Sequence, residues 1–233
     1  MFEQYKKESP IISLLGMGGG IGSYIFTAAD TGYEISRSLR FNSADSAYLS
    51  RTPASVGNRK TWTWAGWVKR SALGAAQGIF EAGTGAGTDT YAGLTFNASN
   101  QIFCGFANAG SGDTYIATSA VFRDCSAWYH LVLTIDTTNA TSTDRIKLWV
   151  NNVRMTAFAD SAYGAQNTDS IMSTTNLHVI GQRRNSSTAY FNGYLADCFL
   201  IDGQALDPTS FGEFDDNGIW QPIDFTQIGR ASV

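Results

Sequence analysis

The feature that most constrains this chain is a series of short segments that alternate apolar and polar side chains. They cover residues 38–41, 47–49, 62–69, 128–136, 145–153 and 191–197. An alternation of period two sends successive side chains to opposite faces of a strand, so each segment can lay one face on a core. Clusters of Gly, Asn, Asp and Ser separate strands at the roughly 8–12-residue spacing of a β-sandwich. The pattern therefore predicts an all-β, antiparallel fold.

Two of these segments predict side-chain directions and a turn. In 128–136, Leu131, Leu133 and Ile135 share one face. In 145–153, Asn151 and Asn152 form a two-residue hairpin turn of type I′, which requires positive φ at both positions. The tryptophans of the segments are expected in the core; they are Trp62, Trp64, Trp67, Trp128 and Trp149.

The order of the segments resembles the concanavalin A-like jelly roll, in its laminin-G-like and pentraxin-like branch. It is still more similar to the laminin-G-like domains of bacteriophage tail, fibre and head-surface proteins. The resemblance implies a concanavalin A-like (laminin-G-like) antiparallel jelly-roll sandwich over residues 31–216, closed by a short turn or helix that Asp207 caps. This fold carries lectins, enzymes and structural modules, so it does not by itself fix a function.

Residues 1–30 are predicted to form an extended, apolar, glycine-rich N-terminal arm, and 217–233 a tail that packs on the domain or on a neighbour. Two other interpretations of the arm stay open: a signal peptide, which Glu3 and Glu8 disfavour, and a removable or disordered tail. We expect the arm to contact sister subunits or other virion proteins and to drive oligomerisation. Its anchoring residues would be Ile11, Ile12, Leu14, Leu15, Met17, Ile21, Ile25 and Phe26.

Composition excludes several classes of function. Charged residues make up 15% of the chain, and the net charge of −4 with scattered Lys and Arg gives no case for nucleic-acid binding. The apolar run at 10–26 is too short and too interrupted by glycine for a membrane span. Three cysteines without C-x-x-C spacing indicate reduced thiols, as in a protein assembled in a host cytoplasm.

The sequence predicts neither a catalytic residue nor a bound cofactor. None of the five glutamates has a partner at the spacing that hydrolytic jelly rolls use, and His130 matches a packing feature of the family. The resemblance implies that Ca²⁺ could bind at a loop rim. The aspartates in suitable loops are far apart in sequence, however, which favours loop and capping roles. They are Asp89, Asp113, Asp144, Asp160 and Asp169.

A carbohydrate site would need an exposed aromatic ring with amide and guanidinium groups around it. Tyr91, Tyr115, Tyr163 and Tyr190 lie at or near loops. The candidate glycan-binding set is Arg183, Arg184, Asn185 and Tyr190. The main interpretation is a bacteriophage virion structural protein that displays the jelly roll on the particle surface, as capsid decoration, neck or fibre. The alternative is a tail-fibre adhesin that binds host glycans.

Overall fold

The computed structural model describes residues 33–86, 90–108, 112–186 and 188–225. The chain divides into two units, Met1–Thr31 and Gly32–Val233, and every described residue belongs to the second. The predicted anchoring residues between Ile11 and Phe26, and the Ca²⁺ candidate Asp89, lie outside the described residues.

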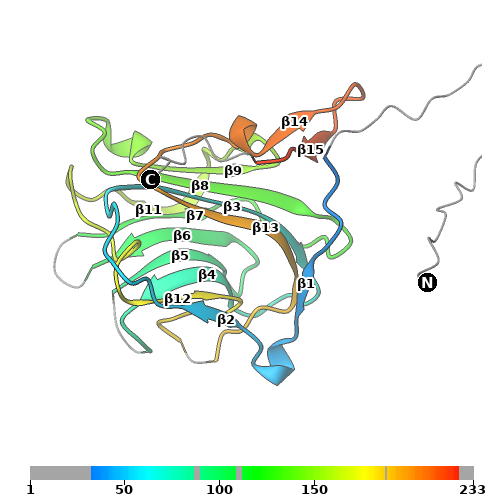
Figure 1. Ribbon diagram of the computed structural model, residues 1–233, viewed down its shortest axis with the longest axis horizontal. Coiled ribbons are helices and arrows are strands. Elements are labelled where there is room, and N and C mark those ends of the chain that lie inside the picture. Colours follow the sequence, from blue (N-terminus) through cyan, green and yellow to red (C-terminus); the bar gives the residue numbers. More distant parts are fainter. Residues whose placement is uncertain (1–32, 87–89, 109–111, 187, 226–233) are drawn as a thin grey trace, which may run out of the picture. The chain divides into compact units, whose positions relative to one another are not determined.

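Two antiparallel sheets stack face to face (Figure 1). The first has the order β1-β13-β3-β8-β9-β10, formed by Leu39–Phe41, Gly193–Asp202, Thr61–Arg70, Tyr129–Asp136, Ile146–Val150 and Val153–Arg154. The second has the order β11-β7-β6-β5-β4-β12-β2, formed by Phe158–Ala162, Thr114–Thr118, Ile102–Ala107, Tyr91–Phe96, Gln77–Gly83, Leu177–Ile180 and Leu49–Arg51. A separate hairpin joins β14 (Gly212–Phe214) to β15 (Trp220–Pro222). The predicted all-β jelly-roll sandwich is confirmed.

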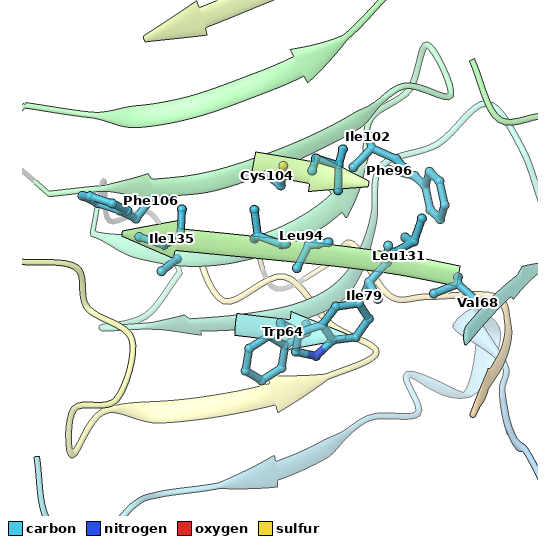
Figure 2. Packing of buried hydrophobic residues seen from close by; sticks show 14 of the residues in the cluster. Trp64, Val68, Ile79, Leu94, Phe96, Ile102, Cys104, Phe106, Leu131 and Ile135 are labelled. Carbon is cyan, nitrogen blue, oxygen red and sulfur yellow. The ribbon is translucent and has the colours of Figure 1, made fainter. Parts of the chain in front are cut away.

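The core lies between the two sheets and follows the predicted alternation. Leu131, Leu133 and Ile135 of β8 are fully buried. They belong to one core cluster with Leu94 and Phe96 of β5, and Figure 2 shows Leu131, Ile135, Leu94 and Phe96 within it. Short 3₁₀ turns at Ser43–Asp45, Ser142–Asp144 and Pro208–Ser210 supply the remaining regular structure among the described residues. Asp207 caps the last of these, as predicted, by accepting the Thr209 N–H at 3.0 Å.

The turn between β9 and β10 is the predicted type I′ hairpin. Asn151 and Asn152 have φ values of 49° and 65°, and Val150 pairs with Val153 across the turn. Asparagine tolerates this left-handed region better than most residues. The pair of asparagines in the sequence was therefore sufficient to predict this turn.

The expectation that all five tryptophans lie in the core is wrong for Trp67, Trp128 and Trp149. Trp62 and Trp64 are buried between the sheets, but position 67 has the opposite parity along β3 and points outward. Trp67 and Trp128 line a hollow of about 410 Å³ beside the β15 strand. Trp149 packs on a smaller outer cluster centred on Ala65, Val132 and Phe211.

The C-terminal segment packs on the outer face of the six-stranded sheet. Trp220 of β15 donates its indole N–H to Nδ1 of His130 at 3.0 Å, and the His130 ring stacks on Trp67 with centroids 4.8 Å apart. Phe211 and Phe225 stack on each other at 4.8 Å over the same sheet. His130 therefore has a structural partner, as its position in the sequence predicted. No helix in the described part of the chain is long and apolar enough to cross a membrane.

Candidate functional site

A row of aromatic rings crosses the outer face of the seven-stranded sheet. Tyr91 of β5, Phe103 of β6 and Tyr115 of β7 have the parity opposite to the core residues and are partly exposed. The Phe103 ring lies 6.5 Å from the Tyr91 ring and 5.1 Å from the Tyr115 ring, measured between centroids. The three rings form a continuous apolar strip that water reaches.

The strip has little side-chain bulk around it. Gly105 pairs with Tyr115 on the neighbouring strand, and a Cβ at Gly105 would clash with the Thr114 carbonyl, so only glycine fits there. At the β7 end, the Tyr115 hydroxyl donates to Oδ2 of Asp160 on β11 at 3.1 Å. The strip thus ends in a carboxylate that holds the last ring in place.

At the β4 side of the same face lies a buried carboxylate. Glu81 is only 1% exposed, and its Oε2 accepts backbone N–H groups from Arg184 and Asn185, the latter at 3.2 Å. The Arg183 Nε lies 3.8 Å from Oε1 of Glu81. Burial raises the pKa of Glu81, and the nearby Arg183 and the two N–H donors oppose that effect.

The loop that carries these groups lies directly over β4. The backbone N–H of Gly181 donates to Ile79 at 2.9 Å, and that of Gly78 donates to Ala189 at 3.2 Å. A Cβ at Gly78 would clash with the backbone of Gln182 and Arg183, so glycine is required for this close approach. The loop therefore has a fixed position above the sheet, with Glu81 holding its tip.

Some hydrogen-bonding capacity of this loop is unused. The Nε atoms of Arg183 and Arg184 and the Oδ1 atom of Asn185 are buried and have no hydrogen-bond partner among the described residues. Leaving such atoms unpaired costs about 1–3 kcal/mol each.

The structure brings together three of the four predicted glycan-binding residues. Arg183, Arg184 and Asn185 surround Glu81, whereas the Tyr190 ring lies beside Tyr48, with centroids 6.2 Å apart. Glu81 and Phe103 were missed by the sequence reasoning. The position of Glu81, alone among the glutamates in a strand-like run, was a usable signal.

The aspartates proposed for Ca²⁺ do not converge. Asp144 pairs with Arg154 at 2.9 Å and Lys147 at 3.5 Å, while Asp169 lies 3.5 Å from Arg59. Within the described ranges, no group of three or more His, Cys, Asp or Glu residues could hold a metal ion.

Comparison with known proteins identifies the family. Residues 41–209 match a laminin-G-type family model described as the concanavalin A-like lectin/glucanases superfamily. The chain belongs to this family. The laminin-G-like resemblance seen in the strand order is thereby confirmed. No curated protein matches the chain.

Solved structures are similar to the chain at low identity. Domains LG4-5 of the mouse laminin α1 chain match with 14% identity and a TM-score of 0.52, covering 76% of this chain and 44% of that one. The heptameric SAP-like pentraxin of Limulus polyphemus has 16% identity and a TM-score of 0.44, covering 68% and 70%. The CBM40 of the Ruminococcus gnavus IT-sialidase has 15% identity and a TM-score of 0.49, covering 69% and 95%. At 14% identity, the likeness to the laminin domains concerns the fold alone.

Proposed function

We propose that the domain is a non-catalytic carbohydrate-binding module that holds a glycan on the outer face of its seven-stranded sheet. The observation that carries the proposal is the partly exposed row of Tyr91, Phe103 and Tyr115. Binding sites for small ligands combine apolar and aromatic surface with a few fixed polar groups. A sugar ring, with an apolar C–H face and polar edges, has the matching chemistry.

The polar groups beside the row fit the edges of such a ligand. Arg183, Arg184 and Asn185 offer donors and an acceptor at one end, and Tyr115 with Asp160 offers a hydroxyl and a carboxylate at the other. Glu81 accepts the backbone N–H groups of Arg184 and Asn185 and so holds the backbone that carries these side chains in a fixed position. Such preorganisation lowers the entropic cost of binding.

The same geometry argues for binding without hydrolysis. Glycosidases of the usual kind need two carboxyl groups that flank the bond, roughly 5–10 Å apart, and reach the substrate. Glu81 is 1% exposed and already accepts two backbone N–H groups, so its oxygens face the protein's own loop. We therefore expect no turnover of β-glucan or capsular polysaccharide.

A glycan array with the full chain tests the proposal. The expected result is binding that falls about tenfold or more in Phe103→Ala, since an aromatic contact contributes about 0.5–1.5 kcal/mol beyond its buried area. Phe214→Ala is the matched control, because Phe214 is also an exposed ring, 55% exposed, but lies on β14. Equal binding by the wild type and Phe103→Ala, or no binding to any glycan, would overturn the proposal.

We also propose that the module is displayed on a bacteriophage virion, as capsid decoration, neck or fibre, after assembly in the host cytoplasm. The support is the similarity of its strand segments to phage surface domains, together with three cysteines that are all free. Residues 1–30 would attach it to other virion proteins. Immunogold electron microscopy of intact particles should label a surface structure, and deletion of residues 1–30 should abolish labelling. Absence of the protein from particles would contradict this proposal.

A further inference from the structure

A hollow of about 450 Å³ opens into the space between the two sheets. Leu200 of β13 pairs with the buried Trp64 of β3, so it lies on the core side of the six-stranded sheet. His178 of β12 pairs with Ala82 of β4, a member of the core cluster, so it lies on the core side of the seven-stranded sheet. Both Leu200 and His178 line the hollow, whose volume falls within the roughly 300–1,000 Å³ of sites for small molecules.

The segment before β3 forms one wall of the hollow and is held in place from two sides. The backbone N–H of Gly57 donates to the Ser173 carbonyl at 2.7 Å, and the backbone N–H of Asn58 donates to Oδ1 of Asp202 at 2.8 Å. Gly57, Ser173 and Asp202 all line the hollow. Its walls are therefore fixed before any ligand binds, which lowers the cost of binding.

The His178 ring has an unused hydrogen-bond acceptor. Its Nδ1 lies 2.8 Å from the Asn176 carbonyl oxygen, which can only accept, so Nδ1 carries the proton. Burial lowers the pKa of His178; the bond to Asn176 opposes this effect and the nearby Arg51 cation adds to it. The ring is thus neutral at pH 7, and Nε2 keeps a lone pair. Nε2 is buried and has no hydrogen-bond partner among the described residues.

A second polar atom of the same hollow is also unpaired. Ser173 is 7% exposed, and its Oγ is buried without a hydrogen-bond partner in the described part of the chain. Buried polar atoms without partners are uncommon in native proteins, and here two of them belong to side chains that line one hollow. The apolar residues that complete the lining are Leu49, Pro53, Phe80, Ile180 and Leu200.

We propose that this hollow binds a small neutral ligand with an apolar body and a hydroxyl group. The hydroxyl group donates to Nε2 of His178, Oγ of Ser173 offers a second hydrogen bond, and the apolar body packs on Phe80. A carbonyl or carboxylate oxygen cannot donate to Nε2, and the Arg51 cation disfavours an ammonium group. The site lies on the core side of the seven-stranded sheet, whereas the aromatic row lies on its outer face, so this proposal does not rest on the proposed glycan site.

NMR titration of the isotope-labelled full chain with cyclohexanol tests the proposal. Amides of residues 49–51, 173, 178–180 and 200–202 should shift, and so should the Nε2 resonance of His178. Cyclohexanol should bind about two- to tenfold more tightly than cyclohexanone, a ring of the same size without a donor, as expected for one hydrogen bond. In His178→Phe this preference should disappear. His130→Gln is the matched control and should keep the preference, because His130 lies on the outer side of the other sheet and already accepts from Trp220.

Three results would overturn the proposal. One is the absence of cyclohexanol binding at the hollow up to the solubility limit of the alcohol. Another is equal affinity of the wild type for cyclohexanol and cyclohexanone. The third is an Nε2 resonance of His178 that does not move at saturation, a measurement that needs no variant. None of these results depends on glycan binding, so the proposed function is tested separately.

Discussion

Acid should destabilise this domain through one histidine. The His130 ring is 2% exposed and lies between Trp67 and Trp220 on the outer side of the six-stranded sheet. Its Nδ1 accepts the indole N–H of Trp220, which requires the nitrogen to be unprotonated. Burial lowers the pKa of His130 from 6.5 to about 4.

The size of the effect follows from that change in pKa. His130 binds a proton near pH 6.5 in the unfolded chain and only near pH 4 in the folded chain. The contribution of neutral His130 to the unfolding free energy is therefore fully present above pH 6.5 and is lost as the pH falls to about 4. At about 1.4 kcal/mol per pKa unit, the lowering corresponds to about 3 kcal/mol of unfolding free energy. That is a large part of the roughly 5–15 kcal/mol of an ordinary domain.

Urea unfolding at pH 7.5 and pH 4.5 measures this contribution. The variant His130→Gln keeps an acceptor for Trp220 but does not titrate, so it should be less stable than the wild type at pH 7.5 and lose less stability on acidification. Burial raises the pKa of Glu81, so its ionisation has the opposite effect: stability rises as the pH falls through its raised pKa. Glu81 is present in both proteins, and its contribution cancels in the comparison. Equal pH dependence of the two proteins would show that His130 is not the source of the acid sensitivity.

Two further substitutions have defined outcomes. Glu81→Gln should loosen the loop over β4 and weaken glycan binding. Its unfolding free energy, measured by urea unfolding, should fall further than that of the wild type between pH 8 and pH 4.5, because it lacks the opposing stabilisation that Glu81 gains as it is protonated. A wild-type pH dependence would contradict the assigned pKa direction. Asn152→Val should cost about 1–2 kcal/mol, because a β-branched residue fits poorly at a φ of 65°, and thermal melts beside the exposed-site control Val153→Thr would detect the loss.

The sequence predicted the six-stranded sheet much better than the seven-stranded one. Apolar and polar residues alternate clearly in segments such as 128–136. One face of this strand packs into the core, and the other carries polar residues together with residues that contact the C-terminal segment. The strands β4 to β7 carry glycine, alanine and aromatic residues on their outer face, as at Gly93, Gly105 and Phe103. Apolar and polar residues therefore do not alternate there. The face whose residues show this weak alternation is the one on which we place the glycan.

The candidate site was only partly predictable. Arg183, Arg184 and Asn185 are adjacent in the chain, so their proximity needed no fold. Their contact with Glu81 joins positions 103 and 104 residues apart and depends on the loop crossing β4 at Gly78. Tyr190 belongs to the returning part of that loop, where pairing with Gln182 directs it toward Tyr48. Closeness in sequence could not show that the Tyr190 ring lies away from Arg183 and Arg184.

The proposed glycan site lies on the outer face of the seven-stranded sheet. Its most direct test is the titration of the isotope-labelled full chain with a glycan identified on the array, followed by NMR chemical-shift mapping. Perturbed amides should cluster at 91–93, 103–105, 115 and 183–185. Perturbations confined to the hollow beside Trp67 and Trp128, or spread without a centre, would contradict it.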